Sequence, residues 1–382
     1  MVKREAIYWN GMSQTVNSSN GEWDFHNEDT QQHLHALHPY PARFVPQIPR
    51  KAILTWSNPG DYVLDPFCGC GTTILESILL GRPAVGVDNN PVAVLVSQAK
   101  AACYTYDDIA ELKQLMNELD RLARFDVSDE YIPDYHNRMY WFSEEAIIDL
   151  GKLKTVLSQL PERPRLLAMS VFSSIIIRAS NQDSDTRYTR VERKYIKGNA
   201  VNWFKGKMTD MMDRLQQIIL LPKSHATIYC ADSRNLGFIG EKSVSLIVTS
   251  PPYLNAYDYH KYHRHRMHWI DGDVIFARDT EIGKHDTFTR PKATPERYFR
   301  DMFECFEQWA HVLVSGGHAF IVIGDAIVNG KPVPVGDTFI SLCEDIGLLF
   351  QQRWIRTLQK ERKSFNQNAR IDREHLLLFK KT

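Results

Sequence analysis

The feature that most constrains this 382-residue chain is a glycine-containing loop, residues 64–73, that joins a strand pattern to a helix pattern. Apolar runs at 62–64 and 84–87 are each followed by helical apolar spacing, at 72–80 and 91–100. Both apolar runs lead directly into an aspartate, Asp65 and Asp88. Strand patterns that alternate with helix patterns predict a mostly parallel sheet in an α/β fold.

The alternation stops between about 105 and 222, where helical spacing predominates, and then resumes. The later strand patterns lie at 226–230, 244–248, 319–323, 349–355 and 375–379, with helix patterns at 296–313 and 335–343. We therefore expect three regions: 1–104 with an N-terminal arm and the first half of the sheet, a helical insertion over 105–222, and the second half over 223–382. The seven strand patterns predict a seven-stranded sheet with helices on both faces.

Composition excludes several classes of protein. The 43% hydrophobic and 24% charged residues are typical of a globular chain, and 46 basic residues balance 46 acidic ones, so DNA or RNA binding would need local patches. No apolar run reaches the 18 residues that cross a bilayer, and no apolar signal segment follows the charged N-terminus, so we expect a cytoplasmic protein without a membrane partner. The six cysteines and fourteen histidines lack metal-ligand spacing, and we expect no metal.

The glycine loop predicts a ligand with an anionic end, because glycine permits close backbone approach and a helix N-terminus attracts negative groups. Position 74 is Ile74 where a dinucleotide fingerprint needs glycine, and no Gly-Lys-Ser/Thr follows. Asp88 is suited to bind a ribose, the alternative being a cap for the helix at 91–100. Asp232, after the third strand, is expected near an adenine. The alternative of a helix N-cap is stronger for Asp232 than it is for Asp88.

The most specific pattern is Thr249-Ser250-Pro251-Pro252-Tyr253, directly after the fourth strand. Two prolines cannot continue a central strand, so the chain must leave the sheet with Ser250 and the Pro251 carbonyl pointing outward. Two acceptors beside an aromatic ring suit an exocyclic amine on a nucleobase, with Tyr253 stacked on that base. The alternative is a structural proline turn with a buried tyrosine.

In this order, the glycine loop, Asp88, Asp232 and Ser-Pro-Pro-Tyr resemble the class I S-adenosylmethionine-dependent amino-methyltransferases of DNA. The resemblance covers about 33–101 and 225–382 and implies a Rossmann-like methyltransferase fold. Ser-Pro-Pro-Tyr is most typical of cytosine-N4 enzymes; adenine-N6 enzymes more often have Asp or Asn before the prolines. No Pro-Cys dipeptide, which a carbon-5 cytosine enzyme needs, occurs in the chain.

The implied function is site-specific methylation of cytosine N4 in double-stranded DNA, within a restriction-modification or related system and with a cognate restriction endonuclease in the cell. Adenine-N6 methylation, RNA guanine-N2 methylation and an inactive DNA-binding subunit are the alternatives. S-adenosyl-L-methionine is the implied cofactor, with its methionine end also held by the proline-containing segment at 38–50. The expected cofactor-binding residues are Pro39, Tyr40, Asp65, Pro66, Phe67, Cys68, Gly69, Gly71, Thr72, Asp88, Asn89, Asp232 and Ser250. The expected catalytic residues are Ser250, Pro251, Pro252 and Tyr253.

Local charge supplies candidate DNA contacts. Residues 178–214 hold nine basic and five acidic side chains, and 353–382 hold nine basic and three acidic ones. The expected DNA-binding residues are Arg187, Arg190, Arg193, Lys194, Lys261, Arg264 and Arg266. For any single one of these side chains a solvated helix face is the alternative. We expect the insertion at 181–207 to read the base sequence and the loop at 254–295 to contact the phosphates.

Overall fold

Seven strands form one sheet in the centre of the computed structural model, which describes residues 22–120, 127, 129–221, 223–289, 293–358 and 373–382. Much of the predicted arm and of the basic 353–382 stretch therefore lies outside the described residues. The sheet strands are β1 (Val63–Asp65), β2 (Ala84–Asp88), β5 (Ala226–Cys230), β6 (Val244–Thr249), β7 (Leu313–Ile323), β10 (Leu348–Thr357) and β11 (Arg373–Lys381). Their spatial order is β10-β11-β7-β6-β1-β2-β5.

The sheet has the topology of a class I methyltransferase. β1, β2, β5, β6 and β7 pair in parallel, whereas β11 runs antiparallel to both of its neighbours, β7 and β10. The strand order reverses between β1 and β6, and ligands in such sheets bind outside the carboxyl ends of the strands at that reversal. The predicted fold, with its mostly parallel seven-stranded sheet, is confirmed.

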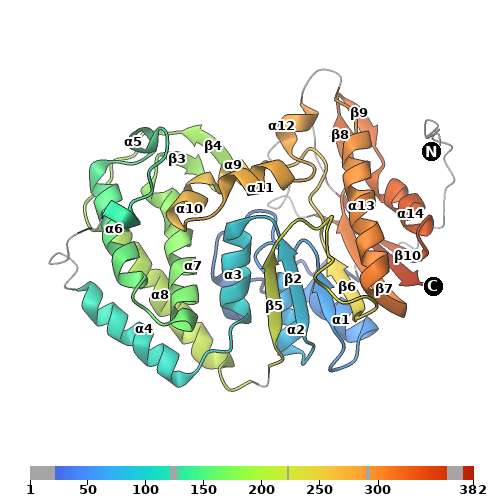
Figure 1. Ribbon diagram of the computed structural model, residues 1–382, viewed down its shortest axis with the longest axis horizontal. Coiled ribbons are helices and arrows are strands. Elements are labelled where there is room, and N and C mark those ends of the chain that lie inside the picture. The colour runs from blue at the N-terminus through green and yellow to red at the C-terminus, as the bar shows by residue number, and fades with distance from the viewer. Residues whose placement is uncertain (1–21, 121–126, 128, 222, 290–292, 359–372) are drawn as a thin grey trace.

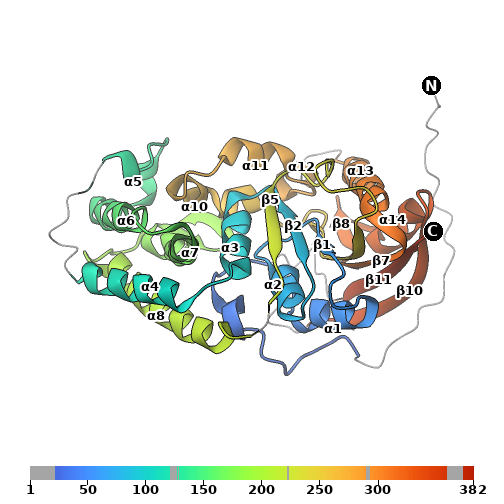
Figure 2. The same cartoon turned by 60° about the horizontal axis from the view of Figure 1, so that its bottom comes forward.

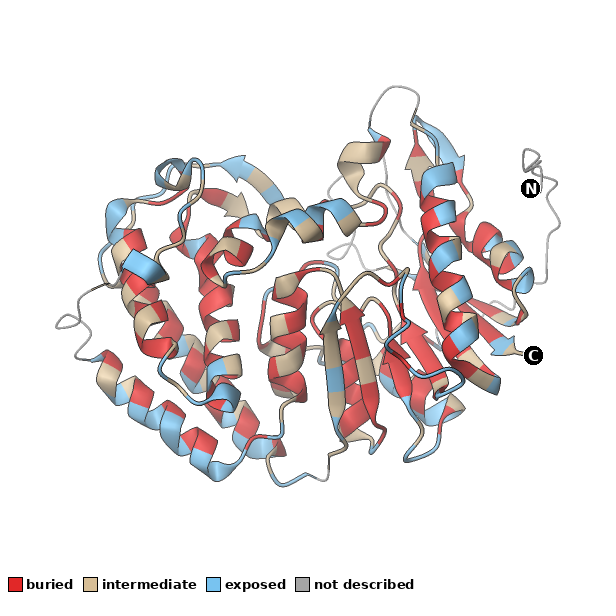
Figure 3. Cartoon of the chain, in the orientation of Figure 1, coloured by how far each residue is buried: buried red, intermediate tan, exposed pale blue. Residues whose placement is uncertain are grey.

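Helices cover both faces of the sheet (Figure 2). On one face lie α1 (Gln47–Trp56), α2 (Thr72–Leu79) and α3 (Pro91–Ala101); on the other lie α13 (Glu296–Val312) and α14 (Val335–Glu344). Alternate strand residues explain this arrangement, because Val63 packs into the cluster that contains α1, and its neighbour Leu64 packs into the cluster that contains α13. The inner strands β1, β2 and β6 are accordingly buried for most of their length, whereas the edge strand β5 has intermediate and exposed residues (Figure 3).

The insertion packs beside α3, on the left in Figure 1. It consists of α4 (Tyr106–Leu119), a 3-10 turn (Asp129–Tyr131), α5 (Arg138–Trp141), α6 (Glu144–Leu157), α7 (Glu162–Ala179), β3 (Gln182–Ser184), β4 (Arg187–Arg190) and α8 (Asn199–Ile218). The β3–β4 hairpin departs from an all-helical expectation. Its strands are polar and short, so they lack the apolar alternation that predicts a strand. One continuous apolar cluster includes both the insertion and residues of α2 and α3.

Short elements surround the carboxyl end of the sheet. They are a 3-10 turn (His33–Ala36), α9 (Tyr259–Tyr262), α10 (Arg264–Trp269), α11 (Val274–Thr280), α12 (His285–Phe288), β8 (Ala326–Val328) and β9 (Lys331–Val333). The predicted loop at 254–295 is thus largely a set of short helices. None of the helices in the described ranges is long and apolar enough to cross a membrane.

Candidate functional site

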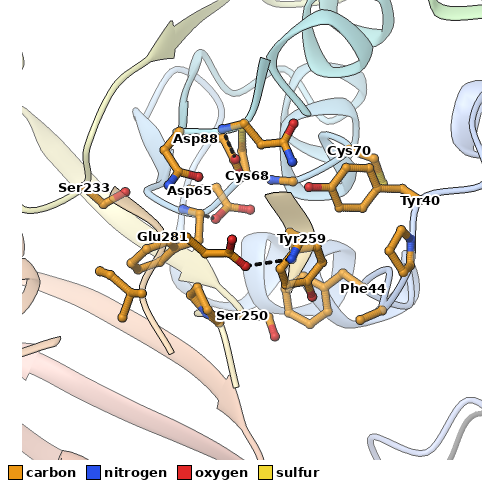
Figure 4. Close-up of a pocket in the computed structure, with 18 of the residues that line it drawn as sticks. Tyr40, Phe44, Asp65, Cys68, Cys70, Asp88, Ser233, Ser250, Tyr259 and Glu281 are labelled. Atoms are coloured by element: carbon orange, nitrogen blue, oxygen red, sulfur yellow. Dashed lines mark hydrogen bonds between the residues drawn. The ribbon is translucent and has the colours of Figure 1, made fainter. Parts of the chain in front are cut away.

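A cavity opens at the carboxyl ends of β1, β2, β5 and β6 (Figure 4). The structure brings most of the expected cofactor residues to its wall: Tyr40, Asp65, Phe67, Cys68, Gly69, Thr72, Asp88, Asn89, Asp232 and Ser250. They come from four strand ends and from the proline segment before α1. The sheet topology therefore brings residues that are up to 210 positions apart, such as Tyr40 and Ser250, into one site.

Asp88 holds the glycine loop and faces the cavity. Its Oδ2 accepts from Gly69 N at 2.9 Å and its Oδ1 accepts from Asn90 N at 2.9 Å. A carboxylate oxygen has two lone pairs, so each oxygen keeps one for a ligand hydroxyl. Burial raises the pKa of Asp88 to about 6, which the two backbone hydrogen bonds partly oppose. The helix-cap role belongs to Asn90, whose side chain accepts from Val92 N.

The two glycines of the loop serve different purposes. Gly69, at φ +48°, faces the Tyr40 ring, which a Cβ would meet at 3.6 Å. Gly71, at φ +72°, is buried against α3, where a Cβ would lie 2.8 Å from Ser97 Oγ and 2.9 Å from Ser97 Cα. Gly71 is therefore required by packing and lies behind the cavity wall, contrary to the expectation of a direct cofactor contact.

Two further expected cofactor residues lie away from the wall. Pro66 is buried and its carbonyl accepts from the Ser233 hydroxyl, so it shapes the loop from behind. Pro39 is exposed and lines a separate cavity beside α7, because the chain turns between it and Tyr40. Neither residue is in place to contact a ligand in the first cavity.

Asp65 and Asp232 also border this cavity with partners of their own. Asp65 accepts from Thr249 Oγ1 at 2.7 Å, and burial raises its pKa to about 6. Asp232 receives two donors of Arg234, with Nη2 at 2.6 Å and Nε at 3.0 Å, and Arg234 also pairs with Asp301 at 3.2 Å. Asp232 thus lies where a ligand is expected, but its carboxylate is already committed to an arginine.

Residues beyond the motifs complete the wall. Glu281 accepts from Tyr259 N at 2.7 Å and from His260 N at 3.1 Å, and so fixes the start of α9 over the cavity (Figure 4). Asn89 donates to Thr280 Oγ1 at 2.9 Å. No sequence motif predicts a site role for Glu281, Tyr259 or Thr280, since they follow no glycine, proline or strand end.

A second cavity, of about 440 Å³, shares the Ser250 wall with the first. Three of the four catalytic candidates, Ser250, Pro251 and Tyr253, line it. Its aromatic lining is completed by Tyr40, Phe44, Tyr257 and Tyr259. Pro252 faces the first cavity instead, and its carbonyl accepts from the Tyr298 hydroxyl at 2.9 Å. Ser250 therefore stands at the boundary between the two spaces.

Two charged residues that sequence analysis missed also line the second cavity. The Tyr253 hydroxyl donates to Glu374 Oε1 at 2.7 Å, and Arg356 Nη1 donates to Glu374 Oε2 at 2.7 Å. The side chains of Arg356 and Glu374 are 4% and 12% exposed. Burial and the adjacent Glu374 raise the pKa of Tyr253 well above its ordinary value, so the phenol stays protonated.

A family model described as DNA methylase matches residues 3–99 and 244–382. The chain belongs to the DNA methylase family. This membership confirms the resemblance to S-adenosylmethionine-dependent amino-methyltransferases of the N4/N6 group. The unmatched stretch contains the whole insertion, in agreement with the part of the chain that the resemblance did not cover.

Curated relatives of the chain include proteins named as type II methyltransferases. The chain is 28% identical over 184 residues to M.MvaI of Kocuria varians. This match covers 44% of this chain and 39% of the relative. It is 26% identical over 237 residues to M.BsoBI of Geobacillus stearothermophilus, covering 52% and 45%. A shorter match, 32% over 78 residues, is to the DNA adenine methyltransferase YhdJ of Escherichia coli, covering 20% of this chain and 26% of the relative. The chain thus spans less than half the length of these relatives.

Among solved structures, a putative DNA modification methylase of Thermus thermophilus, complexed with S-adenosyl-L-methionine, is 21% identical. The match covers 40% of this chain and 51% of that chain with a TM-score of 0.25.

Several basic residues of the chain are exposed near the hairpin and the short helices. Arg187 pairs with Asp183 at 3.2 Å, Arg190 lies 4.7 Å over the Tyr140 ring, and Lys194 is exposed. The Arg193 guanidinium donates to backbone carbonyls of Ile177, Ser180 and Asp183, which ties the hairpin to α7. Lys261 pairs with Asp258 and Asp286, and Arg264 is exposed.

Arg266 corrects one expectation. Its side chain is 0% exposed, pairs with Asp185, and donates through Nε to the Ser173 carbonyl at 3.0 Å. A guanidinium enclosed in this way cannot reach a phosphate, so the expected DNA contact is wrong. The helical spacing of α10 explains the difference, because Arg264 and Arg266 lie two positions apart and point in different directions.

The β3–β4 hairpin lies beside α9 and α10, which follow the Pro-Pro turn (Figure 1). Gln182 of β3 donates to the Tyr262 carbonyl at 3.3 Å, and the rings of Tyr188 and His265 stack at 5.5 Å. Within the described ranges, no group of three or more His, Cys, Asp or Glu side chains is arranged to hold a metal ion.

Proposed function

We propose that the chain methylates the exocyclic N4 amine of cytosine in double-stranded DNA, with S-adenosyl-L-methionine as the methyl donor. The observation that carries this proposal is the position of Ser250 on the wall between two cavities. In this proposal Ser250 touches the reacting atoms of both ligands, one in each cavity. Membership of the DNA methylase family supplies the substrate class.

The first cavity fits the cofactor. Asp88 has free lone pairs for two ribose hydroxyls, and the first turn of α2 supplies N–H groups for a carboxylate. Tyr40 and Phe44, from the proline segment, border the same space. When bound, the cofactor supplies an electrophilic methyl group on a positively charged sulfur.

The second cavity fits a base that has left the duplex. Unstacking one base costs a few kcal/mol, and stacking on an aromatic ring returns about 1–3 kcal/mol. Tyr253 is the stacking ring of the proposal, and the other aromatic residues exclude water from the space. The Ser250 hydroxyl and the Pro251 carbonyl accept the two amine hydrogens and hold the nitrogen lone pair toward the first cavity. Positioning of this kind, without a covalent intermediate, supplies most of the rate.

Cytosine is proposed over adenine because serine precedes the two prolines, the form most typical of cytosine-N4 enzymes. Adenine N6 is the second candidate, favoured by the match to a relative named as a DNA adenine methyltransferase. The same proposal includes a restriction-modification setting, a cytoplasmic location and a cognate endonuclease, since the relatives are named as type II methyltransferases.

Nucleoside analysis tests the base. DNA from cells that express the chain is digested and measured by mass spectrometry, with a Ser250→Ala variant as the control. N4-methylcytosine that depends on Ser250 is expected. N6-methyladenine in its place would move the proposal to adenine, and methylated RNA guanine or no product would exclude DNA amino-methylation.

A further inference from the structure

Arg266 lies where the β3–β4 hairpin, α7 and the short helices meet. Its side chain is 0% exposed, and arginine is rarely buried so completely unless it is paired. Nη2 pairs with Asp185 in the turn of the hairpin, Nε donates to the Ser173 carbonyl of α7 at 3.0 Å, and Nη1 donates to His263 Nδ1 at 3.3 Å. His263 lies between α9 and α10. One buried cation thus joins the hairpin to the helices beside the cavities.

The position of the His263 ring depends on Arg266. An arginine can only donate, so Nδ1 of His263 is the acceptor and the ring proton lies on Nε2. Nε2 is buried and has no partner among the residues that the structure describes, so the bond from Arg266 is the one hydrogen bond of the ring there. Burial and the charge of Arg266 lower the pKa of His263 well below its ordinary value, which keeps the ring neutral and able to accept.

The His263 ring in turn supports the ring of Tyr40. The two rings stack with centroids 4.6 Å apart and an interplanar angle of 21°, whereas the other stacked ring, Tyr259, is 6.1 Å away. Tyr40 lies in irregular backbone between two prolines, so no helix or strand fixes its side chain. It borders both cavities, and Figure 4 shows its hydroxyl directed toward the first. His263 is therefore the nearer stacking support of a ring that faces both proposed ligands.

Packing alone does not explain a charged side chain at position 266. An apolar residue of similar volume often serves a core as well as a buried ion pair or better. The neighbours of Arg266 on α10, Met267 and Trp269, are buried apolar residues of the core cluster shared with the insertion. The partner of Arg266 belongs to the surface, since the Asp185 side chain is 35% exposed on the hairpin that carries Arg187. The ion pair thus connects a surface element to the interior.

We propose that Arg266 is a positioning residue that transmits the placement of the hairpin to Tyr40, so that DNA and cofactor strengthen each other's binding. The hairpin follows the DNA through Arg187, Asp185 moves with the hairpin turn, and Arg266 passes this placement through His263 to the wall of the cavities. The inference rests on the proposed function for the two ligands, and it holds for a cytosine or an adenine target alike. The factor by which DNA tightens cofactor binding must equal the factor by which the cofactor tightens DNA binding.

Calorimetry with S-adenosylhomocysteine, the product form of the cofactor, measures this effect without turnover. Its Kd is measured for the chain alone, with a duplex that carries the site methylated by wild type, and with a duplex of scrambled sequence. In wild type we expect the site duplex to tighten binding about fivefold or more, and the scrambled duplex to leave the Kd within about twofold of the value without DNA.

Asp185→Asn and His263→Phe interrupt the connection at two points. Asparagine keeps the shape of Asp185 without its charge, and phenylalanine keeps a ring against Tyr40 without the acceptor for Arg266. Each variant should reduce the effect of the site duplex to about twofold or less, while the Kd of the chain alone stays within about twofold of wild type. The double variant should lose no more than either single variant, because both changes interrupt the same connection.

Asp271→Asn is the matched control. Asp271 follows α10 and pairs at 2.7 Å with Lys154 of α6, whose side chain is 6% exposed. This pair also joins the insertion to the α10 region through a buried cation, but neither residue belongs to the hairpin or lines the first or second cavity. Asp271→Asn should keep the wild-type effect of the site duplex. Thermal unfolding checks that each variant is folded.

An equal effect of both duplexes on wild type would overturn the inference, and so would an effect of the site duplex that survives in Asp185→Asn or His263→Phe. Additive losses in the double variant, or an equal loss in Asp271→Asn, would also overturn it, since both indicate a general loosening of the insertion. If Asp185→Asn does not fold, His263→Phe decides alone. These outcomes leave the proposed function standing. Failure of the wild-type chain to methylate an amine in DNA would overturn the proposed function, and is seen when the site is mapped, before any variant is made.

Discussion

At the scale of single residues, the site depends on carboxylates that each have a different partner. Among the residues that the structure describes, Asp88 is bound only by backbone N–H groups, Asp232 by Arg234, and Glu374 by Tyr253 and Arg356. The partner decides what the carboxylate has left to offer a ligand. Asp88 keeps free lone pairs toward the cavity, and it is therefore the acidic residue on which cofactor binding should depend most.

Asp88→Ala is expected to weaken S-adenosylmethionine binding by about 1–3 kcal/mol, the cost of leaving two ligand hydroxyls without a partner. Isothermal calorimetry measures the change. Asp232→Ala is the matched comparison and should weaken binding less, since Asp232 already pairs with Arg234. Equal affinity in wild type and Asp88→Ala would remove Asp88 from the binding site.

Cofactor affinity should also fall as the pH is lowered through about 6, the pKa to which burial raises Asp88. Below that pH the carboxyl is protonated, so one acceptor and a negative charge are lost from the cavity; above it the affinity is constant. Calorimetry between pH 7 and pH 5 tests the profile. Asp88→Asn should flatten it, and a profile that persists in that variant would assign the titration to Asp65, whose pKa is also about 6.

At the scale of elements, the parallel core was predictable because buried strands and amphipathic helices have regular apolar patterns. The 226–230 strand and the helix pattern at 91–100, for example, agree with β5 and α3 to within a residue. The β3–β4 hairpin and α9–α12 were missed, since their contacts are polar or made with distant segments. Glu281 and Glu374 were missed for the same reason: only the fold brings them beside Asp88 and Tyr253.

The hairpin arginines are expected to differ in effect. Arg187 is exposed and pairs with Asp183 on the same hairpin, so Arg187→Ala should shift the preferred DNA site without changing the melting temperature. Arg193 ties the hairpin to α7, so Arg193→Ala should lower the free energy of unfolding by about 1–2 kcal/mol. Methylation mapping and thermal unfolding measure the two effects. General weakening of DNA binding by Arg187→Ala, with the site preference kept, would place sequence reading elsewhere, for instance on α9–α12.

At the scale of the whole molecule, the insertion and the sheet share one core. The largest apolar cluster runs from Ile74 of α2 through Val96 of α3 to Phe172 of α7, all of them 0% exposed. The expected region 105–222 is therefore built onto α3 without a break in the packing. An independent recognition domain on a linker would show a boundary with few crossing contacts.

Calorimetry should consequently show a single unfolding transition. Phe172→Ala truncates an insertion side chain of the shared cluster. It should lower the free energy of unfolding of the whole chain by about 3–5 kcal/mol, and unfolding should remain a single transition. Leu220→Ala, at an exposed position just after α8, is the control and should change little. Two separate transitions in wild type would mean that the insertion folds by itself.

The central place of β1 in the sheet has a consequence for biosynthesis. β1 pairs with β2 on one side, at residues 84–88, but its other edge is covered only by β6, at 244–249. During translation the glycine loop and the insertion leave the ribosome first, while β1 still presents a row of unpaired backbone groups. Such an edge is a template for pairing with other chains. The newly made chain is thus most exposed to aggregation before β6 is synthesised, so the strand that leads into the Ser-Pro-Pro-Tyr turn also covers the open edge of β1.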